Sequence, residues 1–374
     1  MAVVSLVLVG VVAASILVLS WELGAAWRLL HRRFAAPEVW PSMSLLKPMA
    51  GRDDELEENL ESHAAIDYPG EWELILGVRS ASDPAYAVAQ AFVARHPGRA
   101  RLVLQEGEPG LNPKVNQLIT LTRHAKGEVI ALTDSNVRVT PQLLREHAAS
   151  LAQPTVGLST HTFAGDGEET LGSAFENMTS ISYIVPNGAT GELSFKLTQI
   201  VGKSLAIKRE ALEAIGGWES VKDLLAEDQR MGIALLKAGY RTLLCPTPVR
   251  CVQKHQTVGQ FVDRQSRWAM IRFRVFGGVY LEPFLFPVLW GLLAVAVNPG
   301  NWWALVSAAV WSMIFTQTLA VWSRGRGFKA WQVVLIPVRD VVFFAAFVLG
   351  RFRSTVIWRG NVLRVGENTQ LSKA

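Results

Sequence analysis

The first 27 residues limit the possible folds more than any other part of this 374-residue chain. Residues 3–20 contain no charged side chain and are mainly apolar, and Trp21 to Trp27 extend the segment. A helix of that length can cross about 30 Å of hydrocarbon. Basic side chains follow the apolar segment, whereas in a cleaved signal peptide they precede it; they are Arg28, His31, Arg32 and Arg33. This order predicts an uncleaved membrane anchor at 1–27, with its N-terminus outside and the next domain in the cytoplasm.

A second hydrophobic region lies near the carboxyl end. Residues 256–280 combine arginines with aromatic side chains, which is typical of an amphipathic helix at a membrane surface. The apolar segments 283–299 and 302–322 are separated by a turn at 298–301 and predict a helical hairpin through the membrane. We therefore expect the membrane helices of this region to lie within 283–350.

The last apolar segment, 331–350, allows two interpretations. Pro337, Arg339 and Asp340 interrupt it, and charged side chains at mid-membrane usually face protein or water. A full crossing would place the basic tail at 351–374 outside, against the positive-inside trend. A re-entrant or interfacial segment would keep that tail in the cytoplasm, and both topologies stay open at this point.

The stretch between these regions, residues 42–255, alternates short apolar segments with helical ones. Strands are predicted at 44–46, 73–78, 100–104 and 128–133, and helices between them at 53–65 and 84–95. This alternation predicts an α/β domain with a mainly parallel, Rossmann-like sheet covered on both faces. In such sheets ligands bind beyond the carboxyl ends of the strands.

Composition excludes several classes of protein. Half of the residues are hydrophobic and mean hydropathy is +0.22, which is too apolar for an ordinary soluble enzyme. The formal charge of +5 comes without a basic tail interleaved with aromatics, so we expect no nucleic-acid partner. Cys245 and Cys251 are too few for a disulfide framework or a structural zinc site. His161 and His255 lack the spacing of metal ligands and are interpreted as structural.

Asp134 directly follows the fourth predicted strand, and Asn136 comes two residues later. Oxygen ligands of this kind suit Mg²⁺ or Mn²⁺, which can also hold a diphosphate. The alternative is a strand-ending aspartate that caps a turn.

Glu227 and Asp228 precede a predicted helix at 231–236. Asp228 is a candidate general base that takes a proton from an acceptor hydroxyl. The alternative is that both acids only stabilise the positive end of the helix dipole.

Further along the chain, Arg264, Arg267 and Trp268 lie on the predicted interfacial helix. Arginine can hold a diphosphate through paired donors, and the alternative is anchoring to lipid headgroups. Lys47 and Lys114 are candidate phosphate-binding cations, and Lys47 could instead be only a surface charge. Asn112 and Asn116 flank Lys114 and could orient loops or sugar hydroxyls, or form a turn that leads into a helix. An acid, a base and a cationic pair in this order indicate sugar transfer from a nucleotide donor.

The chain resembles the ceramide glucosyltransferase family and its bacterial and hopanoid-associated relatives. The segments that carry the resemblance are Leu45-Leu46-Lys47-Pro48, Asn59-Leu60-Glu61, Asp67-Tyr68-Pro69, Asp83-Pro84-Ala85, Gly110-Leu111-Asn112-Pro113-Lys114-Val115-Asn116, Asp134-Ser135-Asn136-Val137-Arg138-Val139, Gly216-Gly217, Ala226-Glu227-Asp228, Arg264-x-x-Arg267-Trp268 and Trp358-Arg359-Gly360. They extend over about 230 residues, with the carboxyl-terminal motif beyond them.

The resemblance implies a glycosyltransferase type A fold, a UDP-sugar donor, a divalent metal and inverting transfer to a lipid on the cytoplasmic face. Residue by residue, it makes Asp134 the metal-linked acid, Asp228 the base, and Arg264-x-x-Arg267-Trp268 the donor clamp. The family usually has an acid where this chain has Ser80. Asp83 is the nearest acid and is expected to replace it in the uridine pocket; the alternative is that this contact is absent.

The function expected from the sequence is transfer of one hexose, glucose, to ceramide, by an enzyme of the bacterial inner membrane. Hopanoid or diacylglycerol acceptors remain alternatives. A processive polysaccharide synthase shares the motif order but normally needs more membrane helices. A membrane scaffold built on a degenerate transferase is a third alternative, which the intact set of motifs disfavours.

Overall fold

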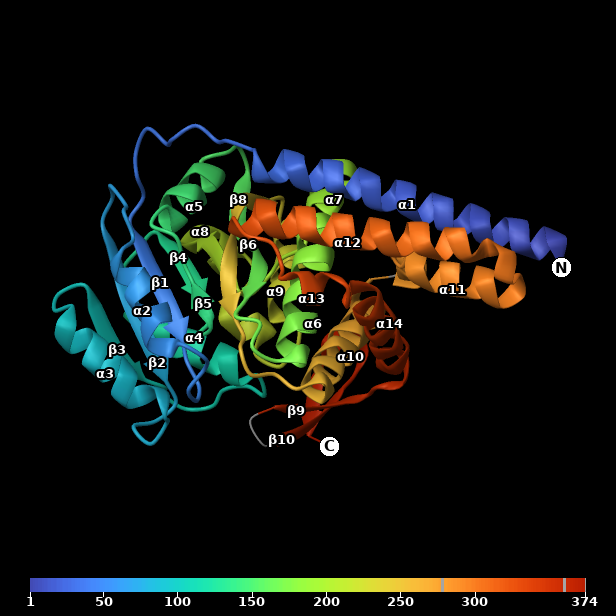
Figure 1. Ribbon diagram of the computed structural model, residues 1–374. Coiled ribbons are helices and arrows are strands. Elements are labelled where there is room, and N and C mark those ends of the chain that lie inside the picture. Colours follow the sequence, from blue (N-terminus) through green and yellow to red (C-terminus); the bar gives the residue numbers. More distant parts are fainter. Residues whose placement is uncertain (277–278, 359–360, 374) are drawn as a thin grey trace. The chain divides into compact units, whose positions relative to one another are not determined.

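The computed structural model describes residues 1–276, 279–358 and 361–373. The chain forms two compact units, each built from several segments. The sheet unit comprises His31–Asp166, Gly191–Gln253 and Thr355–Ala374. The helical unit comprises Met1–Leu30, Gly167–Thr190 and Lys254–Ser354. Figure 1 gives the elements of both units.

One eight-stranded sheet forms the centre of the sheet unit, in the order β3-β2-β1-β4-β7-β6-β8-β5. All strands run in one direction except β7 and β5, which pair antiparallel with their neighbours. The strands are β1 (Met43–Pro48), β2 (Trp72–Val78), β3 (Ala100–Leu104), β4 (Val129–Thr133), β5 (Val137–Arg138), β6 (Val156–Asp166), β7 (Ser204–Lys208) and β8 (Arg241–Val252). The first four coincide with the predicted strands, and the predicted α/β class with a mainly parallel sheet is confirmed.

Helices accompany this sheet. They are α2 (Leu56–Ala64), α3 (Ala85–Arg95), α4 (Pro113–His124), α5 (Leu143–Leu151), α8 (Arg209–Ala214) and α9 (Glu227–Lys237). Every residue of β4 is buried, as expected for a central strand enclosed by packed side chains. Ile130 of β4 and Leu118 of α4 belong to one apolar core with Leu235 of α9. The core fixes β4, α4 and α9 with respect to one another, and these elements carry the polar site described below.

The carboxyl-terminal residues belong to the sheet unit. They form a small antiparallel sheet of β9 (Thr355–Trp358), β10 (Asn361–Val365) and β11 (Leu371–Lys373). Two backbone hydrogen bonds join this sheet to the segment before α9. Leu225 N donates to Thr369 O at 3.0 Å, and Leu371 N donates to Asp223 O at 2.7 Å. The range 351–374, expected as a basic tail, therefore contains folded structure. Arg359 and Gly360 of the Trp358-Arg359-Gly360 motif lie outside the described residues.

The helical unit contains the long apolar helices. Its helices are α1 (Ala2–Leu30), α6 (Leu171–Thr179), α7 (Val185–Phe195, which continues into the sheet unit), α10 (Val258–Val275), α11 (Pro287–Val297), α12 (Trp302–Arg324), α13 (Ala330–Val333) and α14 (Ile336–Phe352). Helix α1 packs against α11 and α12 through Val12, Val288 and Ala308. Two helical segments in the described residues are long and apolar enough to cross a membrane, Ala2–Leu30 and Pro299–Arg324.

The boundaries of the two units also differ from the ranges expected from the sequence. Residues 167–190 were expected within the 42–255 domain, but they cluster with the apolar helices. Helix α6 packs on α10, which joins this insertion to the segment predicted as interfacial. Of the expected 256–280 helix, 258–275 is helical and residues 277–278 lie outside the described part of the chain.

Candidate active site

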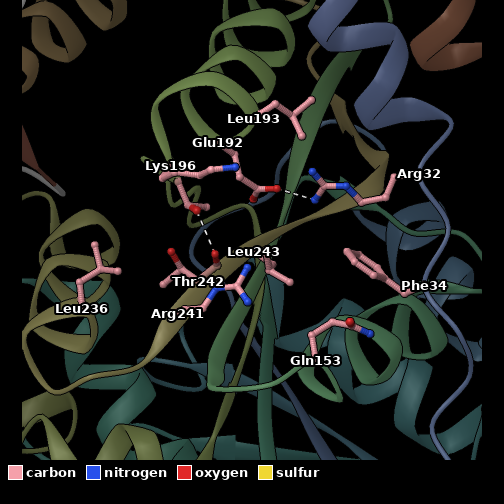
Figure 2. Close-up of a pocket in the computed structure, with 11 residues that line it drawn as sticks. Arg32, Phe34, Gln153, Glu192, Leu193, Lys196, Leu236, Arg241, Thr242 and Leu243 are labelled. Carbon is pink, nitrogen blue, oxygen red and sulfur yellow. Dashed lines mark hydrogen bonds and ion pairs between the residues drawn. The ribbon is translucent and has the colours of Figure 1, made fainter.

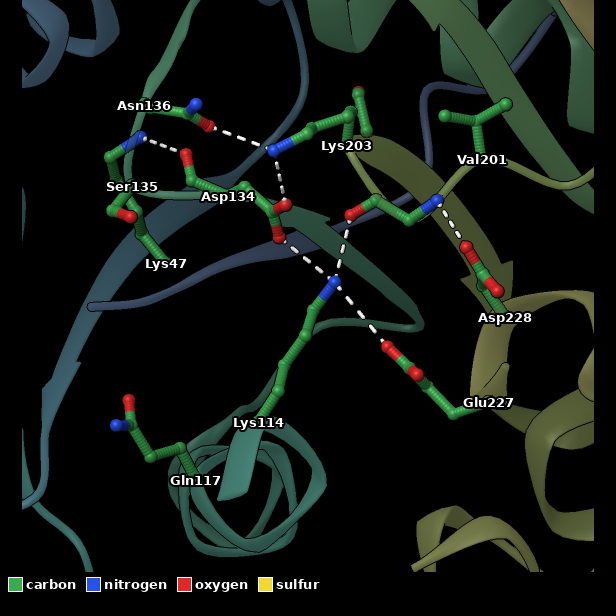
Figure 3. Close-up of polar contacts among 12 residues, drawn as sticks. Lys47, Lys114, Gln117, Asp134, Ser135, Asn136, Val201, Lys203, Glu227 and Asp228 are labelled. Carbon is green, nitrogen blue, oxygen red and sulfur yellow. Dashed lines mark hydrogen bonds and ion pairs between the residues drawn. The ribbon is translucent and has the colours of Figure 1, made fainter. Parts of the chain in front are cut away.

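Polar side chains meet just beyond the end of β4, all within the sheet unit (Figure 3). Asp134 follows β4, and each of its carboxylate oxygens forms an ion pair with a lysine. Lys114 Nζ lies 2.8 Å from Oδ1 and Lys203 Nζ lies 3.0 Å from Oδ2. Lys203 also donates to Asn136 Oδ1 at 2.9 Å. Asp134, Asn136 and two lysines therefore form one charged cluster.

Lys114 connects this cluster to the acids of α9. Its Nζ lies 3.5 Å from Glu227 Oε1 and donates to Gly202 O at 2.9 Å. Lys114 stands in the first turn of α4, whose N-cap is Asn112. The Asn112 side chain accepts from the backbone of that first turn and donates to Glu227 Oε2 at 3.2 Å. The position of Lys114 is thus fixed at both ends of its side chain.

Asp228 is held by backbone amides. Gly202 N donates to Oδ2 and Gln229 N donates to Oδ1, both at 2.7 Å. The second bond satisfies an amide of the first turn of α9, whose N-cap residue Ala226 makes no side-chain cap bond. A Cβ on Gly202 would lie 2.9 Å from both Asp228 Oδ2 and Lys114 Nζ. A side chain at position 202 would therefore displace the end of the Asp228 or Lys114 side chain.

Burial and the neighbouring lysines shift the pKa values of these carboxyl groups in opposite directions. Burial would raise the pKa of Asp134, but Lys114 and Lys203 outweigh it and hold that pKa well below its usual range. Burial raises the pKa of both Glu227 and Asp228, because Lys114 compensates it only in part. The lysines therefore favour the charged form of Asp134, whereas burial favours proton uptake by Asp228 relative to an ordinary aspartate.

The remaining candidate residues of the sheet unit, Lys47, Asn116 and Asp83, form hydrogen bonds with backbone groups. Lys47 is fully buried and donates to Asp134 O at 2.7 Å and to Val137 O at 3.3 Å. Burial lowers the pKa of Lys47 to about 7, although Asp134 opposes the shift. Asn116 bonds both ways with the backbone of Gly110. Asp83 Oδ1 accepts from Gly51 N and Ala85 N, each at 2.9 Å, and so joins the end of β1 to the start of α3.

Sequence reasoning missed Lys203. It precedes β7, and no motif surrounds it. The antiparallel pairing of β4 with β7 places it beside Asp134, since Thr133 pairs with Ser204 and Asp134 N donates to Lys203 O at 3.2 Å. Lys203 could have been found only from the pairing of β4 with β7, which the local sequence does not contain.

Arg264, Arg267 and Trp268 belong to the helical unit, on α10. Arg264 Nη1 lies 3.4 Å from Glu176 Oε1, and its guanidinium lies 6.0 Å from the centre of the Trp268 ring. Thr257 and Gln260 form a capping box at the start of α10. The three side chains thus share one well-defined helix. Their role in donor binding stays a prediction.

The comparison with solved structures supports the fold. A mannosyltransferase of Pyrobaculum calidifontis, solved with GDP-mannose and Mn²⁺, superposes with a TM-score of 0.52 at 19% identity. The match covers 92% of this chain and 98% of that one. The expected glycosyltransferase type A fold is confirmed.

Sequence comparisons give the family. Ceramide glucosyltransferase 3 of Caenorhabditis elegans is 27% identical over 358 residues, which cover 91% of this chain and 76% of the relative. Ceramide glucosyltransferase 1 of the same organism is 29% identical over 251 residues, covering 65% of this chain and 52% of that relative. The family model described as glycosyl transferase family 21 matches residues 5–371. The chain is therefore a sugar-transferring enzyme, and with its ceramide glucosyltransferase relatives it belongs to glycosyl transferase family 21.

Proposed function

We propose that the chain transfers one glucose from UDP-glucose to the hydroxyl of ceramide in a membrane, with inversion at the anomeric carbon. The names of the two Caenorhabditis elegans relatives support the sugar and the acceptor. The long apolar helices support a lipid acceptor. The observation that carries the proposal is the pair of acids Asp134 and Asp228, joined through Lys114 and Gly202 beyond the end of β4.

Asp228 acts as the general base. Its carboxylate takes the proton from the acceptor hydroxyl while that oxygen attacks the anomeric carbon. The bond from this carbon to the diphosphate oxygen breaks, and its electron pair leaves with UDP. Attack opposite the leaving group gives inversion. The amides of Gly202 and Gln229 orient the carboxylate before the reaction, and general-base catalysis of this kind contributes roughly 10²- to 10⁴-fold.

Asp134 and Asn136 fit a divalent metal because carboxylate and amide oxygens are suitable ligands for Mg²⁺ or Mn²⁺. The ammonium groups of Lys114 and Lys203 lie at the two Asp134 carboxylate oxygens, so a metal ion bound there would take the place of one of them. A bound ion would neutralise the charge of the leaving diphosphate. Lys114, Lys203 and Lys47 add positive charge around the same carboxylate or its backbone.

The other predicted contacts are part of the same proposal. Arg264, Arg267 and Trp268 hold the donor diphosphate, and Asp83 contacts the uridine. Helix α1 anchors the chain with the sheet unit in the cytoplasm, where UDP-glucose is available. Each of these assignments rests on the sequence motifs.

The test is mass spectrometry of lipids after purified full-length protein is incubated with Mg²⁺, UDP-glucose or UDP-galactose, and ceramide, diacylglycerol or hopanoid. We expect monohexosyl ceramide, from UDP-glucose and not from UDP-galactose. A product formed only on another lipid contradicts the ceramide assignment. Asp134→Asn serves as the matched variant, which we expect to lose metal-dependent UDP affinity without unfolding. Normal UDP affinity in that variant would remove Asp134 from the metal site.

A further inference from the structure

The sheet unit contains a pocket of about 530 Å³ that shares no residue with the Asp134–Asp228 site (Figure 2). Three basic side chains and one acidic side chain line it, so its lining carries a formal charge of +2 (3 − 1). The basic residues are Arg32, Lys196 and Arg241, and the acid is Glu192. A pocket of this charge attracts an anion.

The acid does not neutralise the two exposed cations. Glu192 forms an ion pair with Arg32 and accepts from Leu244 N at 2.5 Å. Within the described part of the chain, neither Lys196 nor Arg241 forms a side-chain ion pair, and both are exposed. Arg32 and Glu192 thus build one wall, while Lys196 and Arg241 are available to a ligand.

Apolar side chains complete the lining. Phe34, Leu193, Leu236 and Leu243 lie around the same cavity. A free phosphate ion would gain no binding energy from these apolar side chains, whereas the glycerol and upper acyl chain of a lipid would remove them from water. The combination therefore fits a phosphate group that is attached to an apolar body.

Two neighbouring side chains support a membrane ligand independently. Phe195 is 59% exposed and Leu197 is 63% exposed, on either side of the pocket residue Lys196. Lys196 has a φ of 59°, and a bond from Leu197 N to Gly191 O at 2.9 Å fixes this turn at the end of α7. An aromatic and an aliphatic side chain that flank a lysine form the pattern of a surface that dips into lipid.

One pocket residue, Arg32, is close in the chain to the end of α1. Arg32 comes two residues after the end of α1 at Leu30. Consecutive Cα atoms are about 3.8 Å apart, so Arg32 lies within roughly 8 Å of the end of that helix. If α1 crosses the membrane as proposed, the pocket lies at the level of the lipid headgroups.

We propose that this pocket binds the phosphate of an anionic membrane lipid, with Lys196 and Arg241 as its ligands and Phe195 and Leu197 inserted beside it. Arginine and lysine both pair with phosphate oxygens, and basic side chains at a membrane surface each add to the attraction. This is a site for a lipid that is not consumed, and it is separate from the transfer reaction.

The test is titration of the detergent-purified full-length protein with dioleoyl phosphatidylglycerol, followed by native mass spectrometry. The pocket variant is Lys196→Gln with Arg241→Gln. The matched control is Arg123→Gln with Lys126→Gln, which removes the same charges from exposed positions outside the pocket. We expect the affinity for phosphatidylglycerol to fall roughly 10- to 30-fold in the pocket variant and to stay unchanged in the control.

Four further arms complete the test. Phosphatidylcholine is expected to bind unmodified protein at least tenfold more weakly, and Phe195→Ser with Leu197→Ser is expected to lower lipid retention while leaving the charges intact. Equal binding of the two lipids, or unchanged binding in the pocket variant, overturns the proposal. Displacement of phosphatidylglycerol by equimolar glycerol phosphate would assign the pocket to a soluble phosphate and overturn the lipid source. UDP-glucose turnover by the pocket variant, measured in parallel, separates a failure here from a failure of the proposed transfer.

Discussion

Asp228 and Asp134 are both aspartates in one network, yet their surroundings give them different chemistry. Two lysines pair with the oxygens of Asp134, whereas backbone amides hold those of Asp228. The first environment keeps a carboxylate charged, and the second orients one that can accept a proton. At the residue scale, the site is therefore a division of roles between two acids that Lys114 connects.

Replacing Asp228 tests this division. Asp228→Asn keeps the size of the side chain and an oxygen that can accept from Gly202 N, but it removes the base. We expect kcat/KM for sugar transfer to fall by at least roughly 10²-fold, with UDP affinity nearly unchanged. Transfer assays and calorimetric titration with UDP measure the two effects. A parallel loss of UDP affinity would contradict the assignment of Asp228 as base.

The pH profile is a second test at this scale. Burial raises the pKa of Asp228 above that of an ordinary aspartate, about 3.9. A base must be deprotonated, so activity is present above the raised pKa and is lost as pH falls through it. We expect the acidic limb of kcat/KM to lie above the usual aspartate range. A limb at or below pH 4 would show that another group limits the reaction.

At the scale of elements, local patterns predict more than long-range pairings do. The first four strands and the helix that carries Asp228 are visible in the sequence because each is a short apolar or periodic segment with polar ends. Lys203 and the antiparallel strand β7 are not, because their places depend on pairing with β4 across some 70 residues. The insertion at 167–190 escaped prediction for the same reason, since its packing on α10 is a tertiary contact.

Helices α10 and α14 pack closely at a glycine, and this gives an element-scale prediction. A Cβ on Gly350 would lie 2.5 Å from Ala269 Cβ and 2.6 Å from Ser266 O. Gly350→Ala must therefore separate the two helices, and overpacking of this kind costs about 1–3 kcal/mol. We expect a lower unfolding temperature in detergent. The control is Gly24→Ala on α1, where a Cβ meets nothing within 4 Å and no loss is expected. Equal stability of both variants would contradict this packing.

At the scale of the molecule, a hydrogen bond relates the turn between α11 and α12 to the start of α1. Asn301 Nδ2, at the turn between α11 and α12, donates to Ser5 Oγ at 2.8 Å near the start of α1. This turn and the amino terminus therefore lie at the same level of the helical unit. Helix α12 has 23 residues, or roughly 35 Å, whereas α11 has 11 and reaches roughly 17 Å. Residues 283–299, expected to be half of a hairpin, are thus helical over only part of a membrane thickness.

The folded carboxyl terminus favours one of the two topologies that the sequence left open for 331–350. The strands after Thr355 are bonded through Thr369 and Leu371 to the segment that precedes α9, so they must lie on the same side of the membrane as the Asp228 site. Helix α14 has 17 residues, or roughly 26 Å, and contains the buried ion pair of Arg339 with Asp340 at 3.0 Å. Both features favour a re-entrant or interfacial α14.

With α1 crossing once and the α11–α12 region returning to the side it started from, we expect an amino-terminal reporter outside and a carboxyl-terminal reporter in the cytoplasm. A third reporter inserted in the 35–37 linker should share the side of the carboxyl terminus, and opposite sides for these two would show that α14 crosses the membrane.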